Sequence, residues 1–415
     1  MTAICIVYGN RPLISETFLA AHLDRLQGTK VVLYNYFPEY TFQGRTLRYF
    51  YSRHPWISKA KRLLPQFLYD RFVTRSETSD ERTLDFMSGF VRDQDVDVFL
   101  AEYGFNGADI TPIARKLNIP LVVHFHGHDA HSETALKGYE ARYRAMFEYA
   151  HSLVSVSHPM TENLIRLGAP ESKIVYNPYG AREYFFDVQP DYRQTLIAVG
   201  RFADIKAPYL TLMAFREALQ TVPDAKLIMV GDGPLFEACK SMAIMWGIEK
   251  SVTFTGALPH DQVLPMMSQA CAFVQHSVTT TYGDMEGMPN SILEAGAAAL
   301  PVISTRHAGI PTAVIEGETG FLLDERDVSG MAANMCRLLD DPALCRSMGT
   351  KARQHIKENY HIDRHIACLQ NLIDEARTAN CQLPTDDFYF IQDCREVLGD
   401  VGRVQGVSHE PSLRQ

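Results

Sequence analysis

The sequence predicts an α/β protein with two Rossmann-like, doubly wound domains that face each other across a cleft. Three observations predict this fold. Short β-branched runs alternate with longer amphipathic segments, which is typical of parallel sheets covered by helices on both faces. The alternation restarts after an acidic, proline-containing segment at residues 183–193. The length of 415 residues also suits two domains of ordinary size.

The first half of the chain contains six expected strands, with helical patterns such as Glu16–Leu26, Ala135–Tyr149 and Thr161–Leu167 between them. The strands are Ile4–Tyr8, Val31–Tyr36, Val96–Ala101, Leu121–Phe125, Leu153–Val156 and Ile174–Tyr176. Each run is short, apolar and bounded by turn-forming residues, as expected of a buried strand. We assign residues 1–185 to the first domain.

The second half repeats this organisation, with helical patterns such as Tyr209–Leu219 and Leu235–Trp246. The expected strands are Leu196–Val199, Lys226–Val230, Val252–Thr255, Ala272–Gln275, Val302–Ser304 and Gly320–Leu323. We assign residues 194–355 to the second domain and residues 356–415 to C-terminal helices and a tail. A ligand is expected at the carboxyl ends of the strands, between the two domains.

Composition excludes several classes of protein. The net charge of −9 disfavours nucleic acid as a general partner. None of the eight cysteines forms a CxxC pair, so a zinc ribbon or a thioredoxin-type site is not predicted. The first residues lack the basic region of a signal peptide, and no run approaches the roughly 18 to 20 apolar residues that cross a bilayer. We therefore expect a cytoplasmic protein.

Two loops at strand ends carry residues suited to a diphosphate. Gly200 ends one strand and is followed by Arg201 and Lys206; an arginine pairs with two phosphate oxygens, and a lysine acts as a point charge. Gly231 and Gly233 end the next strand, where glycine allows the backbone to approach a ligand closely. Taken singly, solvated cations and a tight turn explain these residues about as well.

Two acids, Glu286 and Glu294, flank the expected start of a helix. Gly287, Met288 and a proline follow the first acid, which fits a loop that turns into a helix with free N–H groups. Such a helix start favours anions, and acids beside it suit neutral partners such as sugar hydroxyls. Glu294 lies among small apolar residues, and a buried acid without a partner is costly. The pair therefore indicates a nucleotide-sugar pocket.

These motifs, in this order and spacing, resemble the family 4 retaining glycosyltransferases (glycosyl transferases group 1), which have the GT-B fold. The resemblance is strongest from Leu196 to Leu323. It implies that residues 1–185 form the acceptor side and residues 194–355 bind the nucleotide sugar. It also implies no dedicated protein nucleophile and no obligatory metal or cofactor, the donor being a co-substrate.

The resemblance further implies the roles of individual residues. Arg201 and Lys206 hold the donor diphosphate, with Gly231 and Gly233 beside it. Glu294 binds the ribose hydroxyls, and Glu286 meets the transferred sugar. The N–H groups around Gly287 and Met288 support phosphate and sugar.

A histidine cluster follows the strand Leu121–Phe125. His124, His126 and His128 alternate along the chain, and imidazoles that converge in this way suit zinc. Gly127 interrupts the strand, however, and no second cluster of acids is evident. The resemblance instead assigns His126 as an active-site histidine that faces the donor sugar.

Residues 45–75 form a basic and aromatic segment with a single acid, Asp70. Such a composition suits a membrane surface or an anionic lipid-linked acceptor, at the inner face of the membrane. An ordinary helical insertion explains it about equally well. Ser15-Glu16-Thr17-Phe18 also resembles members of the family that build bacterial exopolysaccharides and lipid-linked oligosaccharides.

We therefore predict a hexosyltransferase that moves a sugar from a UDP or GDP donor to a glycan, lipid-linked or small-molecule acceptor, with retention of configuration. The alternative is a nucleotide-sugar epimerase or hydrolase on the same pair of domains, the hydrolase with a metal at the histidine cluster. A third hypothesis, a non-catalytic sugar-binding subunit, does not explain why both acids and both cations are kept. Peripheral membrane contact through residues 45–75 remains one of two interpretations.

Overall fold

The computed structural model describes residues 2–9, 17–37, 39–47 and 81–380. Two sheets form its framework, and all twelve strands predicted from the sequence are present in them. The predicted α/β fold class is confirmed.

The first sheet has the strand order β4-β3-β2-β1-β5-β6-β7-β8. Its strands are β1 (Ala3–Tyr8), β2 (Thr29–Tyr34), β3 (Thr41–Phe42), β4 (Arg45–Thr46), β5 (Val98–Glu102), β6 (Leu121–His124), β7 (Ser152–Ser155) and β8 (Ile174–Tyr176). β1, β2 and β5–β8 pair in parallel, whereas β3 and β4 are antiparallel. The β3–β4 hairpin was not predicted; Gln43 and Gly44, both at positive φ, form its two-residue turn.

The second sheet has the order β11-β10-β9-β12-β13-β14, and all its pairs are parallel. Its strands are β9 (Thr195–Val199), β10 (Lys226–Val230), β11 (Val252–Gly256), β12 (Ala272–Val274), β13 (Val302–Thr305) and β14 (Gly320–Leu323). The strand order reverses between β9 and β12, which is where ligands bind in doubly wound sheets.

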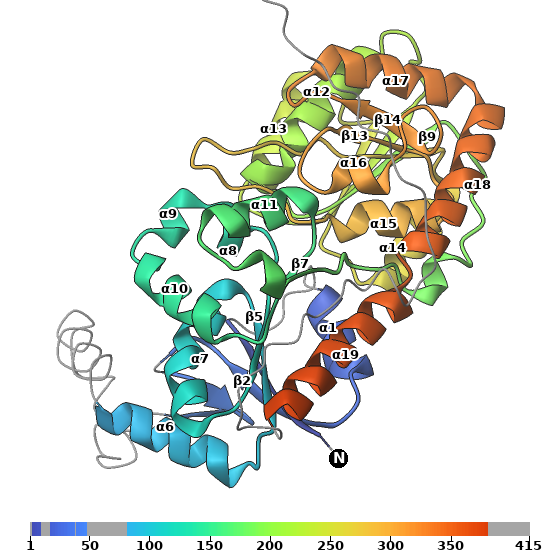
Figure 1. Cartoon of the computed structure of the whole chain (residues 1–415). Coiled ribbons are helices and arrows are strands. Elements are labelled where there is room, and N and C mark those ends of the chain that lie inside the picture. The colour runs from blue at the N-terminus through green and yellow to red at the C-terminus, as the bar shows by residue number, and fades with distance from the viewer. Residues whose placement is uncertain (1, 10–16, 38, 48–80, 381–415) are drawn as a thin grey trace, which may run out of the picture. The chain divides into compact units, whose positions relative to one another are not determined.

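Helices cover both sheets (Figure 1). Those of the first half are α1 (Thr17–Arg25), α6 (Glu81–Asp93), α7 (Gly104–Leu117), α8 (His128–His131), α9 (Glu133–Leu136), α10 (Glu140–Tyr149) and α11 (His158–Arg166). Those of the second half are α12 (Pro208–Ala218), α13 (Phe236–Met245), α14 (His260–Gln269), α15 (Asn290–Ala297), α16 (Ile310–Ala313), α17 (Val328–Asp340), α18 (Pro342–Asn359) and α19 (Ile362–Asn380). The helix predicted at Ala135–Tyr149 is two helices, because the chain turns at Gly138, where φ is +89°.

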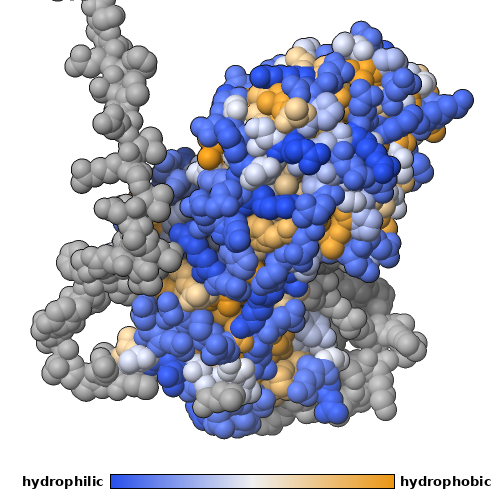
Figure 2. Space-filling model, turned by 90° about the vertical axis from the view of Figure 1, so that its right-hand side faces the viewer, coloured by the Kyte–Doolittle hydropathy of each residue, from blue (hydrophilic) through white to orange (hydrophobic). Residues whose placement is uncertain are grey.

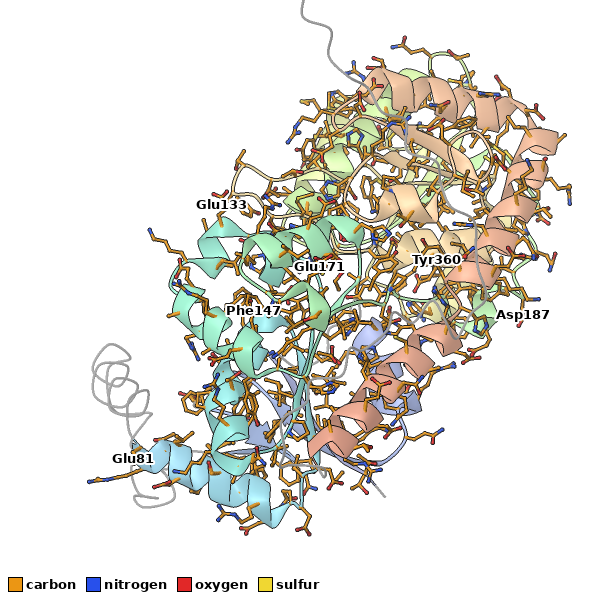
Figure 3. The ribbon with its side chains drawn as sticks, in the orientation of Figure 1. Glu81, Glu133, Phe147, Glu171, Asp187 and Tyr360 are labelled. Atoms are coloured by element: carbon orange, nitrogen blue, oxygen red, sulfur yellow. The ribbon has the colours of Figure 1, made fainter. Side chains whose placement is uncertain are left out.

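Strand alternation divides the first sheet between two cores. Cys5 and Val7 of β1 face a core shared with α7 and α10, whereas Ile4 and Ile6 face α1 and α19. The last described helix, α19, therefore packs against the N-terminal sheet beside α1 (Figure 1). Tyr360, labelled in Figure 3, lies between α18 and α19 and donates its hydroxyl to the Thr312 carbonyl at 2.9 Å.

The predicted domain boundaries, at residues 185, 194 and 355, stay a prediction. The acidic, proline-containing segment at residues 183–193 is packed against the rest of the chain: Phe185, Val188 and Tyr192 are buried. The face of the molecule in Figure 2 is mainly hydrophilic, with apolar side chains in small groups.

Candidate functional site

A pocket lies at the carboxyl ends of the central strands of the second sheet. Its lining includes Gly200, Arg201 and Lys206 after β9, Val230 at the end of β10, and Gln275 after β12. The strand ends meet here because β9 pairs with both β10 and β12. The structure therefore places Arg201 and Lys206, two of the predicted site residues, at the carboxyl end of the sheet.

Lys206 and Glu286 are neighbours in space, although 80 positions separate them in the chain. Lys206 Nζ lies 2.9 Å from Glu286 Oε1, and both side chains are mostly shielded from water. The side chain of Arg201 is exposed and has no hydrogen bond or ion pair within the described part of the chain. One of the two predicted cations is thus paired with a predicted acid, and the other is available to an anion.

Gly231 and Gly233 pack closely against another loop of the chain, and their approach to a ligand stays a prediction. A Cβ atom on Gly231, where φ is +135°, would lie 1.9 Å from the carbonyl oxygen of Gly200. A Cβ on Gly233 would lie 2.6 Å from the carbonyl oxygen of Phe202. These glycines therefore let the β10 turn pack against the loop that carries Arg201, which positions that loop.

The loop before α15 brings Gly287 against the N-terminal half. A Cβ on Gly287 would lie 2.4 Å from the His126 carbonyl oxygen, so only glycine fits without displacement. Met288 is 3% exposed and belongs to the apolar core. On the other side, the Gly287 carbonyl accepts from the Gly309 N–H at 3.1 Å. The loop is therefore held from two sides.

His307 fixes the backbone of Glu286. Its Nε2 accepts from the Glu286 N–H at 3.1 Å, so Nδ1 is the nitrogen of the neutral ring that carries hydrogen. That Nδ1 lies 2.7 Å from the Glu325 carboxylate, which also accepts from the N–H and hydroxyl of Thr279. Sequence reasoning missed this arrangement, because neither His307 nor Glu325 lies in any of the motifs found in the sequence.

Glu294 lies on α15 and is 8% exposed. Burial raises the pKa of its carboxyl to about 7, although Arg182 and Lys206 oppose this rise. His260 Nε2 is 3.8 Å from Glu294 Oε1, beyond hydrogen-bond distance, and its Nδ1 contacts the Tyr184 hydroxyl at 2.6 Å. The carboxylate is thus a buried acceptor with little protein compensation, as a ligand-binding acid would be.

His126 is held inside the N-terminal half by both ring nitrogens. Nε2 lies 2.9 Å from Glu102 Oε2, Nδ1 contacts the Tyr179 hydroxyl, and the ring stacks on Phe18 at 4.2 Å between centroids. Burial, together with His124, lowers the pKa of His126 to about 3, so the ring is neutral. In this conformation the imidazole does not face outward to a sugar; that role stays a prediction.

Asp129 holds the turn after β6. Its carboxylate accepts from the N–H groups of Gly104, His126 and Gly127 at 2.7 to 3.0 Å, and it is fully buried. This clamp places the backbone of His126 against Gly287. Asp129 is therefore a positioning residue of the site rather than an exposed acid.

The zinc site considered at His124, His126 and His128 is not formed. The side chain of His128 is half exposed and lies 3.1 Å from Asp284, away from the other two, because Gly127 turns the chain into α8. Two of the metal-compatible groups among the described residues contain His124, one with His22 and His365 and the other with Glu102 and His126. Sequence reasoning missed His22, Glu102 and His365. The one signal in the sequence was that Glu102, an acid, ends an apolar strand.

Two predictions fall on residues that are not described. Ser15 and Glu16 of the first loop lie outside the described residues, as do residues 48–75 of the basic and aromatic segment. Among the helices that are described, none has the length and apolar character needed to cross a membrane.

Comparison with known proteins gives consistent matches along the chain. Residues 182–355 match the family model "Glycosyl transferases group 1", and residues 19–180 match "Glycosyl transferase 4-like domain". The putative colanic acid biosynthesis glycosyltransferase WcaL of Salmonella typhimurium is 28% identical over 289 residues, 67% of this chain and 71% of that protein.

A second relative is the GDP-mannose-dependent alpha-(1-6)-phosphatidylinositol monomannoside mannosyltransferase of Mycolicibacterium smegmatis. It is 27% identical over 282 residues, 65% of this chain and 74% of that protein. The structure of Anabaena HepE in complex with UDP superimposes with a TM-score of 0.68 at 13% identity, over 90% of this chain and 100% of that one. At this identity the match shows the fold alone.

Proposed function

This chain belongs to the group 1, family 4-like glycosyltransferases of the GT-B fold, and we propose that it transfers a hexose-type sugar with retention of configuration. The donor is a nucleotide diphosphate sugar with uracil or guanine as its base. The acceptor is a glycan, a lipid-linked glycan or a small molecule.

The observation that carries the proposal is the juxtaposition of Lys206 and Glu286 at 2.9 Å beside the strand-end pocket. A diphosphate that enters this pocket meets the Lys206 ammonium and the exposed Arg201 guanidinium. The Glu286 carboxylate, next to the same lysine, is then placed to accept from hydroxyls of the attached sugar. Glu294, buried and poorly compensated, is placed to accept from ribose hydroxyls.

The chemistry follows from these positions. The bond between the anomeric carbon and the diphosphate oxygen breaks, and negative charge develops on the leaving diphosphate. Arg201 and Lys206 stabilise that charge, and an effect of this kind is typically worth about 10²- to 10³-fold in rate. The acceptor oxygen bonds to the anomeric carbon on the same face, and a phosphate oxygen of the leaving group takes its proton. The remaining contribution is the positioning of donor and acceptor.

Relatives support the substrate class. WcaL is named for colanic acid biosynthesis, and the mycobacterial relative is named as GDP-mannose-dependent. HepE was solved with UDP. Both UDP and GDP donors are thus represented among similar proteins, and an acceptor made of sugar or carried on lipid fits the named relatives.

A thermal-shift panel tests the donor. UDP, GDP, ADP and their common sugar conjugates are added to the full chain. The cognate nucleotide raises the melting temperature, because a ligand at 100 times its Kd adds about 2.7 kcal/mol to the free energy of unfolding. Arg201→Ala and Lys206→Ala each lose most of this shift. If none of the nucleotides shifts the melting temperature, the proposed donor site is wrong.

Product analysis tests the reaction itself. Incubation of the cognate donor with a panel of sugar and lipid-linked acceptors yields a glycoside whose anomeric configuration, read by NMR, matches that of the donor. An inverted product contradicts the retaining assignment. Free sugar as the main product with every acceptor favours a hydrolase, and an epimerised nucleotide sugar favours the epimerase alternative.

A further inference from the structure

Four side chains from four separate elements meet in the interior of the N-terminal half. They are His22 of α1, Glu102 at the end of β5, His124 at the end of β6 and His365 of α19. None of them is more than 1% exposed. The interior histidine group, as we call these four residues, lies outside the strand-end pocket and takes no part in the proposed transfer.

The Nδ1 atoms of the three histidines point outward to acceptors. His22 Nδ1 lies 2.6 Å from Glu102 Oε1, and His365 Nδ1 lies 3.0 Å from the Pro178 carbonyl oxygen. A carbonyl or a carboxylate only accepts, so these two Nδ1 atoms carry hydrogen. His124 Nδ1 lies 3.2 Å from Glu102 Oε2, outside hydrogen-bond geometry.

The Nε2 atoms then pose an electrostatic problem. His22 Nε2 and His365 Nε2 are 2.8 Å apart. With hydrogen on both Nδ1 atoms, neutral rings present two lone pairs to each other at this distance, which is repulsive. One ring nitrogen from each of His22, His124 and His365 lies within 4.8 Å of the other two, and both ring nitrogens of His124 are buried without a hydrogen-bond partner among the described residues. A cation between these nitrogens removes the repulsion, and that cation is either a proton or a metal ion.

Two observations favour the metal ion over the proton. A proton joins two nitrogens only and leaves His124 unpartnered in a dry interior, which is costly. The rings are also spaced for three ligands: their centroids are 5.1, 5.3 and 5.5 Å apart. With Zn–N bonds of about 2.0 Å and ring centres about 1.1 Å further out, tetrahedral imidazoles have centroids about 5 Å apart.

We propose that His22, His124 and His365 bind one divalent transition-metal ion of the zinc type. Glu102 and the Pro178 carbonyl hold the outer nitrogens, as partners of this kind do in zinc proteins. On binding, His22 Nε2 and His365 Nε2 separate to about 3.3 Å, the spacing of two tetrahedral ligands. The ion joins α19 to α1 and β6, so its role is structural, and no step of sugar transfer passes through it.

The full chain, purified without a histidine tag, is the protein to test. After growth with added zinc and exhaustive dialysis, elemental analysis is expected to find about one metal ion per chain. His365→Asn and His124→Asn are expected to lose it. His355 and His128 lie outside the interior histidine group, so the variants His355→Asn and His128→Asn are expected to keep the metal ion. Loss of metal from His128→Asn with retention in His365→Asn contradicts this site.

A second measurement does not depend on whether the variants fold. Co²⁺ added to metal-free wild-type protein is expected to give the visible absorption bands of a tetrahedral Co²⁺ ion with nitrogen ligands, at one equivalent. A chelator that removes the ion is expected to lower the melting temperature of the wild-type chain. If the wild-type chain carries no metal after growth with zinc and shows no Co²⁺ bands, the cation between the two Nε2 atoms is a proton and the metal site is wrong.

Discussion

Lys206 Nζ and Glu286 Oε1 form a 2.9 Å ion pair at the end of the second sheet. The lysine side chain is 17% exposed and the glutamate side chain 14%, so water screens the pair only in part. A donor diphosphate must share this lysine with Glu286. The pair therefore links nucleotide binding to the placement of the group that we propose for sugar recognition.

Glu286→Gln is expected to separate these two roles. Removal of the negative charge frees Lys206, so the Kd for the nucleoside diphosphate stays within a few-fold or falls. The transfer rate falls by roughly 10²- to 10³-fold, because a charged acceptor for the sugar is lost. Calorimetry measures the first quantity and steady-state kinetics the second. Glu318→Gln, at an exposed acid, serves as control; loss of nucleotide binding in Glu286→Gln alone contradicts the division of roles.

Gly231→Ala is expected to damage the phosphate side of the pocket through packing. The new Cβ would lie 1.9 Å from the Gly200 carbonyl oxygen, so the loop with Arg201 must move. Gly256→Ala is the matched control: φ is also positive, at +74°, but no atom lies within 4 Å. We expect the control to cost about 1 to 2 kcal/mol in the free energy of unfolding. Gly231→Ala should cost roughly 1 to 3 kcal/mol more, and it alone should weaken nucleotide binding.

The free energies are measured by urea denaturation and the affinities by calorimetry. Equal effects of the two substitutions on both quantities would show that positive φ, rather than contact with the Gly200 loop, is what Gly231 provides.

His307→Phe is expected to lower the transfer rate without a comparable loss of nucleotide affinity. The imidazole accepts from the Glu286 N–H, and the phenyl ring removes this acceptor while keeping an aromatic ring, slightly larger, at the same place. A misplacement of about 1 Å at a reacting centre can cost roughly 100-fold in rate. His307→Gln offers an amide oxygen near the position of Nε2 and should restore part of the rate. If Phe and Gln variants behave alike in kinetics and stability, the hydrogen bond has no role in positioning.

The difference between what the sequence predicted and what it missed has a physical cause. Arg201 and Gly231 were predictable because parallel strands end at one edge of a sheet, so residues after consecutive strands become neighbours. His22 and His365 contact each other across 343 positions, from two helices whose apolar faces look ordinary. No local pattern specifies that contact; it exists because α19 returns to the N-terminal sheet.

His126 shows the limit of motif-based prediction in a second way. The motif lies just after β6, but it does not specify the direction of the His126 ring, which contacts Glu102 and Tyr179. Glu102 ends β5, Tyr179 lies three residues after the end of β8, and neither belongs to the motif. The backbone of His126, rather than its ring, is what contacts the Glu286 loop at Gly287.

Glu294 is expected to make stability depend on pH. Its carboxyl has a pKa of about 7 in the folded chain against an ordinary value of 4.5, because burial disfavours the charged form. The cations that face it are Arg182 and Lys206, and the imidazole of His260, whose pKa burial lowers, lies nearby. Between these two pKa values the folded state binds a proton that the unfolded state has lost. The free energy of unfolding therefore falls as pH rises from about 4.5 to about 7, by up to roughly 3 kcal/mol from this group.

Glu294→Gln removes this penalty, so the variant should match the wild-type chain near pH 5 and exceed it in stability at pH 8. Urea denaturation at both pH values measures the difference, and Glu249→Gln, at an exposed acid, should show none. The same variant should bind the nucleotide more weakly at pH 8, because the ionised carboxylate is the acceptor that we propose for the ribose hydroxyls. A variant that is no more stable than the wild-type chain at pH 8 would mean that Glu294 is compensated in the free protein. Its burial would then be no sign of a ligand.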